Sequence, residues 1–377
     1  SGVNRYTGVW LTAPALVQLE ANVLDWLREW MQFPSTARGL FTTGGSMANF
    51  AAIVCARERK LGTELRRGTL YLSSETHHSV AKSAKLAGIL PDRVRAIPVD
   101  AAFRMRIDRL ADAIATDRAA GLTPFLVVSS AGTTNTGAVD PLREIAALCR
   151  QEGVWHHVDG AYGASFHLCP ELRPLLAGLP EADSLTLDPH KGLFIPYGTG
   201  AVLVRDGEAL RAAHSETASY MPEDRAGTEF YDPHQFGPDL SRNFRGLPVW
   251  LAIKLYGAAR YRAALAEKRA LALDAAKRIA ALPHVVMDAP PQLSLFAFHL
   301  EWPGATLAEQ DAATRELLER VTQRGKVFIT GCHAGGRFLA RVCVLSFRTR
   351  QEQIDSCVEH IAEEAQAIIA RRRRPPP

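Results

Sequence analysis

Short apolar runs alternate with stretches of helical periodicity over most of the chain. Residues 16–30 carry apolar side chains at helical spacing, and Phe33-Pro34 breaks the pattern. We expect strands in LYLS, VRAIPV, FLVVSS, VWHHVD, SLTLD and GAVLV, separated by helices over 77–87, 107–119 and 141–150. Continuous apolar strands between amphipathic helices predict an α/β fold with a mostly parallel sheet covered on both faces.

The pattern changes in the last third of the chain. Residues 247–282 have the pattern of a long helix, with a bend expected near Gly257. After Pro283 come the strand-like runs VVM, LSLFAFHL, KVFI and FLARVCVL with two flanking helices. We therefore predict a large ligand-binding domain over 1–282 and a small α+β domain over 283–377.

A polar stretch over residues 214–245 follows the last strand of the predicted large domain. It shows no clear periodicity and is too long for a plain connector. We expect a mobile functional loop there.

Composition and charge narrow the class of function. The chain has 377 residues, of which 47% are hydrophobic, which is enough for a core in both domains. Its net charge of +4 is mixed along the chain except in the run 371–374, which favours small-molecule chemistry over nucleic-acid or membrane binding. The six cysteines lie far apart without metal-ligand spacing, so we expect reduced thiols and no metal. We see no signal peptide or membrane-spanning run, and expect a cytoplasmic protein.

The strongest candidate for chemistry is Lys191, in the sequence Asp-Pro-His-Lys-Gly directly after the predicted strand SLTLD. A lone lysine at a strand end is usually just solvated. Here another strand, VWHHVD, ends in Asp159, 32 residues earlier, and open α/β sheets bind ligands at the carboxyl ends of their strands. An amine and a carboxylate facing one ligand suit pyridoxal phosphate: the amine forms an imine, and the carboxylate keeps the ring nitrogen protonated.

Three further segments would complete such a site. Thr-Thr-Gly-Gly-Ser at 42–46 precedes an amphipathic helix whose free N–H groups suit a phosphate, although alone it would be read as a helix cap. AGTTNTG over 131–137 follows FLVVSS and would place Thr133 near the ring edge. His77, after LYLS, would stack on a flat ring, whereas for His78 we expect a surface position capping its helix.

The segments AGTTNTGAVD, HHVDGAYG and DPHK resemble the pyridoxal-phosphate decarboxylases of aromatic L-amino acids, glutamate and histidine, and the similarity runs over residues 6–361. The resemblance implies an aspartate-aminotransferase-type fold, with a mostly parallel seven-stranded sheet and a small C-terminal domain. It also implies a homodimer with active sites at the subunit interface. The implied reaction converts an L-amino acid to its amine and carbon dioxide.

The resemblance assigns roles position by position. It makes Lys191 the Schiff-base lysine, Asp159 the partner of the pyridine nitrogen and His77 the group stacked on the ring. The implied cofactor contacts are Gly45, Ser46, His77, Thr133, Asp159, Ala161, His190 and Lys191. The implied substrate contacts are Tyr6, Trp10 and Arg341.

A loop tyrosine, delivered from the neighbouring subunit, protonates the substrate carbon in the family. Here the corresponding loop is 214–245, anchored by Ser-Arg-Asn-Phe-Arg-Gly at 241–246. Our choice is Tyr231 with Tyr220 as runner-up, because the spacing to Arg242 differs from that of the relatives.

Two other functions stay open at this point. One is an oxidative aldehyde synthase of the same fold. The other is a non-catalytic regulatory or binding relative, because the family has a further, largely helical N-terminal segment and this sequence begins after it. Intact Lys191, Asp159 and His77 argue against the second.

The substrate is the least determined feature of the sequence. Four aromatic residues would form a flat apolar slot that favours an aromatic amino acid, although any of them would equally serve as core. They are Tyr6, Trp10, Phe194 and Tyr197.

Overall fold

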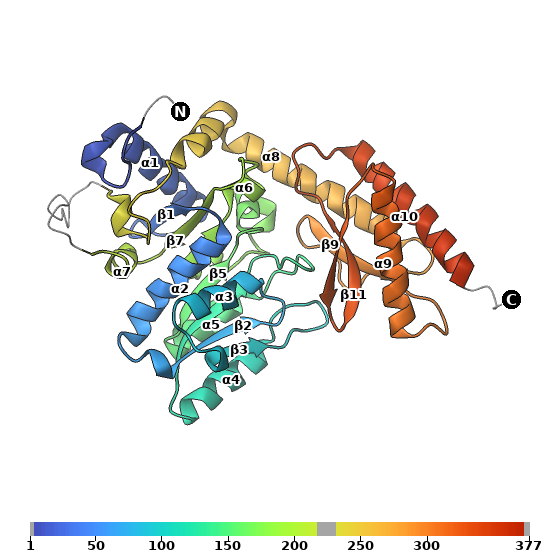
Figure 1. Ribbon diagram of the computed structural model, residues 1–377, viewed down its shortest axis with the longest axis horizontal. Helices are drawn as coiled ribbons and strands as arrows, with labels where there is room; N and C mark the ends of the chain where they lie inside the picture. Colours follow the sequence, from blue (N-terminus) through green and yellow to red (C-terminus); the bar gives the residue numbers. More distant parts are fainter. Residues whose placement is uncertain (1–3, 217–230, 373–377) are drawn as a thin grey trace.

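The computed structural model describes residues 4–216 and 231–372. In these ranges the chain forms a seven-stranded sheet followed by a four-stranded sheet. Figure 1 shows the two sheets side by side, with the long helix α8 (Gly246–Ala280) running from one to the other. The α/β class expected from the sequence pattern is confirmed.

The larger sheet has the strand order β1-β7-β6-β5-β4-β2-β3. Its strands are β1 (Arg38–Thr42), β2 (Gly68–Ser73), β3 (Val94–Ile97), β4 (Thr123–Ser130), β5 (Trp155–Asp159), β6 (Ser184–Leu187) and β7 (Gly200–Val204). Neighbours from β6 to β3 pair in parallel, while β7 is antiparallel to β6 and β1. The strand expected in GAVLV is β7, but its reversed direction was not predicted, because periodicity carries no strand direction. The sequence pattern does not predict β1, a five-residue run directly before a helix.

Helices cover both faces of this sheet. One face packs against α2 (Gly45–Leu61), α3 (His78–Leu86) and α7 (Gly207–Ala212). The other packs against α1 (Pro14–Trp30), α4 (Ile107–Ala119), α5 (Leu142–Glu152) and the first part of α8. Two-sided coverage explains why the strands are apolar throughout instead of alternating.

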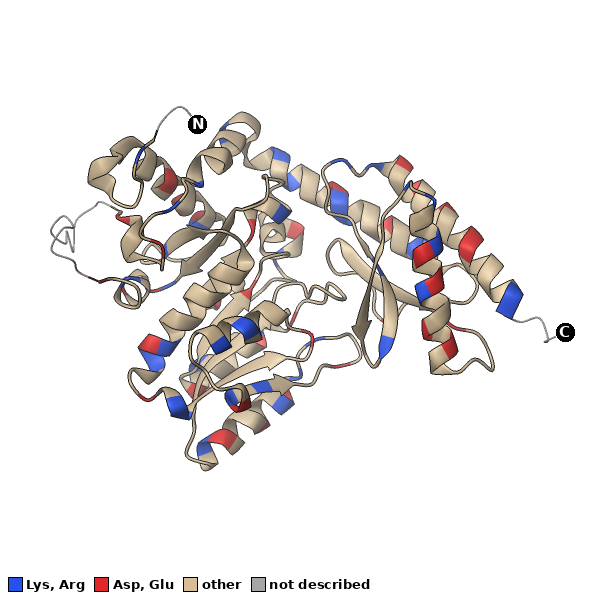
Figure 2. Cartoon of the chain, viewed as in Figure 1, with Lys and Arg blue, Asp and Glu red and all other residues tan. Residues whose placement is uncertain are grey.

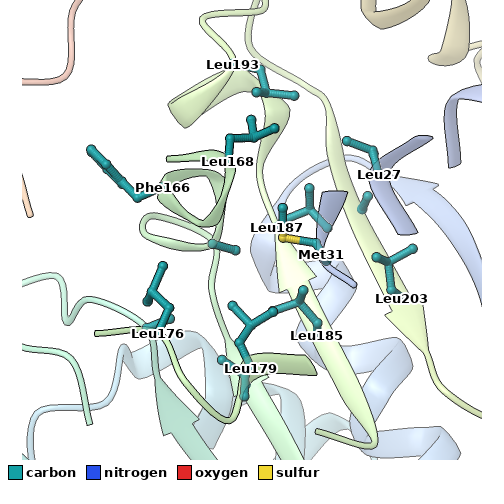
Figure 3. Close-up of a cluster of buried hydrophobic side chains, with 14 of the residues drawn as sticks. Leu27, Met31, Phe166, Leu168, Leu176, Leu179, Leu185, Leu187, Leu193 and Leu203 are labelled. Carbon is teal, nitrogen blue, oxygen red and sulfur yellow. The ribbon is translucent and has the colours of Figure 1, made fainter. Parts of the chain in front are cut away.

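The core beside β6 shows how the sheet is held (Figure 3). Leu27 of α1 and Met31, directly after this helix, lie in one buried cluster with Leu185 and Leu187 of β6 and Leu203 of β7. Leu185 and Leu187 are two residues apart and therefore point to the same face of the sheet. Burial of each such side chain contributes about 2 kcal/mol. The end of β6, from which the chain continues to Asp-Pro-His-Lys, is thus rigidly placed.

The smaller sheet is antiparallel in the order β10-β11-β9-β8. Its strands are β8 (Val285–Val286), β9 (Leu295–Leu300), β10 (Thr330–Ala334) and β11 (Arg337–Cys343), with helices α9 (Leu307–Gln323) and α10 (Gln351–Arg372). The strand predicted in KVFI is wrong, because pairing begins only at Thr330. Gly335 and Gly336, with φ of 58° and 77°, form the two-residue turn between β10 and β11 and so set this register.

Helix α8 has 35 residues and is interrupted at Gly257, whose φ of 71° and ψ of 159° are not helical. The expected bend is therefore confirmed. The domain division expected near Pro283 and the functional loop over 214–245 stay predictions, and the middle of that loop lies outside the described residues.

The surface carries charges of both signs. Figure 2 shows Lys or Arg next to Asp or Glu along α9 and α10. All six cysteines are free thiols. Among the helices within 4–216 and 231–372, none combines the length and the apolar character needed to span a bilayer.

Candidate active site

A cavity of about 330 Å³ lies where the carboxyl ends of β1, β2, β4, β5 and β6 meet. This volume is in the range of small-molecule sites. Its wall brings together all the residues that the sequence assigns to a cofactor. They are Gly45, Ser46, His77, Thr133, Asp159, Ala161, His190 and Lys191.

Lys191 enters the cavity from α6 (Pro189–Gly192), one short turn after β6. Its Nζ lies 2.9 Å from Oδ2 of Asp188. The other oxygen, Asp188 Oδ1, is buried and has no hydrogen-bond partner among the described residues. Burial raises the pKa of Asp188, and the Lys191 ammonium opposes that rise. The lysine is thus held at the cavity by a carboxylate of its own helical turn.

Asp159 ends β5 and forms another part of the wall. Its Oδ2 accepts a hydrogen bond from Nδ2 of Asn49 at 2.9 Å, and its Oδ1 accepts one from the Ala161 backbone N–H at 3.2 Å. The side chain is buried. The two donors hold this carboxylate in place at the cavity wall.

His77 reaches the cavity from the loop between β2 and α3. It is also the N-cap of α3, because its Nδ1 accepts from the Ser79 backbone N–H at 3.3 Å. The capping role that we expected of His78 therefore belongs to His77. Burial lowers the pKa of His77, and the neighbouring His78 lowers it further. A neutral imidazole is suited to lie against a flat ring.

Gly45 and Ser46 begin α2, whose first turn has no side-chain cap. The amide groups of an uncapped helix start attract an anion such as a phosphate. A side chain at position 45 would come within 3.0 Å of Ala161 and 3.1 Å of Asp188, so glycine keeps this approach open. His190 stands beside this turn and donates from Nδ1 to the Thr199 carbonyl at 2.7 Å.

Thr133 lies in the glycine-rich turn after β4. Its Oγ1 bonds to Thr136 Oγ1 at 2.9 Å and accepts from the Ala138 N–H at 3.2 Å. These bonds close the turn on itself and fix Thr133 at the cavity wall.

A second cavity, of about 680 Å³, adjoins the first and shares Thr134, Tyr162, His190 and Lys191 with it. Its remaining wall is largely apolar and comes from the loop between α6 and β7 and from the smaller sheet with the segment after β11. That wall comprises Phe194, Ile195, Pro196, Tyr197, Leu295, Arg341, Cys343, Leu345, Ser346 and Phe347. Arg341 is tied there by hydrogen bonds to the Thr134 carbonyl and, at 3.0 Å, to Thr330 Oγ1.

The remaining predicted residues do not line either cavity. Tyr6 and Trp10 lie in the N-terminal segment, where the backbone N–H of Trp10 donates to Asp232 Oδ1 at 2.6 Å. The Tyr231 hydroxyl donates to the Gly39 carbonyl at 3.0 Å, and burial raises the pKa of Tyr231. Tyr220 lies outside the described residues. Roles for these side chains stay predictions.

The wall residues for which the sequence predicted no role include Asp188, Asn49 and Tyr162. Asp188 and Asn49 both lie in segments that the sequence assigns to the site, but neither residue was predicted to bind the cofactor or the substrate. A polar Asn49 on a helix face that is otherwise buried and apolar was the available signal. Tyr162 had no such signal, because its partner Ser294 is far away in the sequence: their hydroxyl groups are 3.0 Å apart.

These groups fit pyridoxal phosphate. An amine and a buried carboxylate line one cavity, a helix start suited to an anion stands at its rim, and the Asp188 oxygen without a partner marks a wall built for a polar ligand. The fold and site together define a pyridoxal-phosphate enzyme of the α/β class.

Known proteins agree with this class. The family described as "Pyridoxal-dependent decarboxylase conserved domain" matches residues 1–301. The chain is 35% identical over 371 residues to the aromatic-L-amino-acid decarboxylase of Bacillus atrophaeus, covering 97% of this chain and 77% of that protein. It is 30% identical to the 4-hydroxyphenylacetaldehyde synthase of Rhodiola rosea, covering 98% and 77%. The crystal structure of Oryza sativa TDC with PLP and tryptamine superposes with a TM-score of 0.91 at 28% identity, covering 96% and 78%.

The chain belongs to the pyridoxal-dependent decarboxylase family. It is a pyridoxal-phosphate-dependent decarboxylase, as the sequence predicted.

Proposed function

We propose that this enzyme decarboxylates an aromatic L-amino acid to the corresponding amine and carbon dioxide. The observation that carries the proposal is the apolar cavity of about 680 Å³ beside Lys191, with Phe194, Tyr197 and Phe347 in its wall. An aromatic ring in such a cavity gains stacking contacts in addition to burial. The relatives named for aromatic amino acids, among them the Bacillus atrophaeus enzyme, support the same substrate class.

Each wall residue has a proposed task. Pyridoxal phosphate, when bound, supplies an aldehyde that captures amines and a ring that accepts electrons. Lys191 holds the cofactor covalently, and Asp159 holds the proton on its ring nitrogen. His77 lies against one ring face. The other proposed cofactor contacts are Gly45, Ser46, Thr133, Ala161 and His190.

Arg341 is the proposed partner of the substrate carboxylate. Its guanidinium stands in the wall of the apolar cavity, fixed by hydrogen bonds to Thr134 and Thr330. A guanidinium that keeps some donors engaged is pre-organised, and it loses less freedom when it binds a carboxylate.

A loop tyrosine is the proposed proton donor to the substrate carbon. Our choice from the sequence is Tyr231, with Tyr220 as the alternative. Since the Tyr231 hydroxyl is engaged with the Gly39 carbonyl, an acid role for Tyr231 requires that bond to open, whichever subunit supplies the tyrosine. If Tyr231→Phe leaves amine formation unchanged, Tyr220→Phe is the next variant to test.

An oxidative aldehyde synthase is the second candidate function, because a relative 30% identical carries that name. Product analysis separates the two: a decarboxylase releases amine without oxygen uptake, whereas the synthase releases aldehyde and consumes oxygen. A switch from amine to aldehyde in Tyr231→Phe would support the proposed proton donor.

A homodimer is proposed from an apolar stripe on α8. Leu247, Leu251 and Leu255 follow one another at intervals of one helical turn, and they are 43%, 47% and 67% exposed. Exposed leucines at this spacing are typical of a helix face that a partner covers. Light scattering after gel filtration would show a dimer for the parent and a monomer for Leu251→Glu. Leu307→Glu, at a 48% exposed leucine of α9, is the matched control.

Substrate screening tests the main proposal. Carbon dioxide release should be fastest with tyrosine, tryptophan, phenylalanine or their hydroxylated forms, and at least about tenfold slower with aliphatic, acidic and basic amino acids. A preference for glutamate would contradict the proposal.

The cytoplasmic location stays a prediction that fractionation of the producing cells would test.

A further inference from the structure

A buried chain of hydrogen bonds extends beneath the cavity and ends at Asp159. Trp155 Nε1 donates to Ser184 Oγ at 2.8 Å, and Ser184 Oγ lies 2.8 Å from His157 Nδ1. His157 Nε2 lies 3.0 Å from Asn49 Oδ1, and Asn49 Nδ2 donates to Asp159 Oδ2 at 2.9 Å. All five side chains are buried.

Chemistry fixes the direction of this chain. An indole N–H can only donate, so Trp155 gives its proton to Ser184. The Ser184 hydroxyl can in turn donate its own proton to Nδ1 of His157, and we assign the His157 proton to Nε2, which faces the Asn49 oxygen. That proton points at Asn49 Oδ1, an oxygen that can only accept. Burial lowers the pKa of His157 to about 4, so the ring is neutral near pH 7 and has this single tautomer.

The orientation of the Asn49 amide follows. Its oxygen accepts from His157 and, at 2.7 Å, from the Thr186 hydroxyl. Two donors on one side hold the carbonyl there, so the NH₂ group must face Asp159. A flipped amide would set an oxygen against the carboxylate and an NH₂ group against two donors, which a buried site does not tolerate.

The same amide reaches the other side of the cavity. Asn49 Nδ2 lies 3.4 Å from Ser79 Oγ, which is itself 2.7 Å from Nδ1 of His77. Asn49 therefore contacts the carboxylate assigned to the ring nitrogen and, through one hydroxyl, the imidazole assigned to the ring face.

We propose that Asn49, oriented by His157, is a positioning residue that holds the Asp159 carboxylate toward the ring nitrogen of pyridoxal phosphate. Asp159 receives donors at Oδ2 from Asn49 and at Oδ1 from Ala161. These bonds fix the plane of the carboxylate and leave its remaining lone pairs for the ring N–H. The inference rests on the proposed role of Asp159 and adds the residues that make this role possible.

The test compares two cofactors in one protein: pyridoxal phosphate and 1-deazapyridoxal phosphate, which lacks the ring nitrogen. The affinity ratio isolates the bond between Asp159 and that nitrogen, because all other contacts are shared. For the parent enzyme we expect the dissociation constant of pyridoxal phosphate to be at least about tenfold lower than that of the deaza analogue. Equilibrium dialysis of the reconstituted enzymes measures both constants without reference to activity.

Asn49→Asp is the decisive variant, since it keeps the shape of the side chain but replaces the NH₂ donor by an oxygen. We expect the affinity ratio to fall to about threefold or less, because the new oxygen repels the Asp159 carboxylate or binds its proton. Asn135→Asp is the matched control: Asn135 Nδ2 also donates to a carboxylate, Glu75 Oε2 at 3.1 Å, and Asn135 is outside the cavity wall. Its ratio should equal that of the parent.

His157 supplies an independent pair of variants. His157→Gln keeps a donor near the position of Nε2 and should retain the ratio, whereas His157→Leu removes the donor and should lower it. These two variants keep the proposal testable if Asn49→Asp does not fold.

Each negative outcome has its own meaning. A parent that binds both cofactors equally would overturn the role of Asp159 itself. A parent ratio that survives in Asn49→Asp would overturn the role of Asn49 alone. An equal loss of both affinities in the variant would make Asn49 a structural residue without influence on the ring nitrogen.

Discussion

The cofactor cavity and the apolar cavity beside it share a wall but are built in different ways. The first is lined by polar side chains from strand ends of a single sheet, and several of these side chains are bonded to near neighbours in the chain, as Lys191 is to Asp188. The second is lined by apolar side chains from two regions, with Phe194 in the loop before β7 of the larger sheet and Phe347 in the segment after β11 of the smaller sheet. The comparison suggests that the chemistry is set by local structure and the substrate by the packing of two sheets.

Lys191→Ala is the change with the largest expected effect on the first cavity. It removes the amine that binds the cofactor, so turnover should fall below detection, and the visible absorbance of the bound cofactor should be lost. Spectra and amine release measure both. Lys82→Ala, at an exposed lysine of α3, is the control, and a Lys191→Ala enzyme that keeps both properties would refute the assignment.

Asp159→Ala removes the charge opposite the ring nitrogen. We expect kcat to fall by about 10²- to 10³-fold, as for other pre-organised electrostatic groups. Steady-state kinetics at saturating cofactor measure the effect. A kcat within a few-fold of the parent would show that the ring nitrogen needs no carboxylate here.

Arg341→Gln tests the wall of the second cavity. Loss of a charged hydrogen bond to the substrate carboxylate should raise KM by about 10- to 100-fold. Arg337→Gln is the control on the same strand, because Arg337 donates to Gln310 at 3.0 Å and is not in either cavity wall. Equal KM values for the two variants would leave Arg341 a purely structural residue.

Phe347→Ala should affect the second cavity alone. We expect the preference for tyrosine over leucine, measured as a ratio of kcat/KM values, to fall by about tenfold, since the lost ring contacts favour an aromatic substrate. Phe328→Ala, at a phenylalanine that is 79% exposed, is the control. An unchanged ratio would place the substrate ring elsewhere.

Tyr162→Phe has the smallest expected effect and tests the wall that the two cavities share. The Tyr162 hydroxyl accepts from the Ser294 N–H at 2.9 Å and so ties the first sheet to the start of β9. Its loss should lower the free energy of unfolding by about 1 kcal/mol. Urea titration would measure this, and a larger loss would mean that the two sheets depend on this bond to stay together.

The same contrast explains what the sequence could predict. Lys191 and Asp159 each end an apolar strand, and the strand pattern alone brings such ends to one edge of the sheet. The turn at Gly45 and Ser46 was likewise visible, because glycine next to a helix start is a local signal. The prediction of a flat apolar slot was only partly confirmed. Phe194 and Tyr197 line the second cavity, whereas Tyr6 and Trp10 do not line it in this chain.

Features that depend on the order of the strands in the sheet could not be predicted from the sequence. The bonds from His157 through Asn49 to Asp159 require β5 to lie beside β6 and under α2, and no spacing in the sequence encodes that. The reversed direction of β7 has the same cause. In the small sheet, KVFI is apolar enough for a strand, yet Ile329 is buried in the core cluster that precedes the pairing at Thr330.

The break in α8 has a mechanical consequence. Before Gly257 the helix packs on α1. Beyond it, Tyr261 and Leu265 still lie in the core of the larger sheet, and from Leu271 onward the helix packs under the smaller sheet. The part of α8 after the break is therefore one continuous helix anchored in both cores, and the glycine changes only the direction of the first turns along α1. The spacing of the two sheets, and with it the width of the apolar cavity, is thus fixed by a stretch of helix that the break does not interrupt.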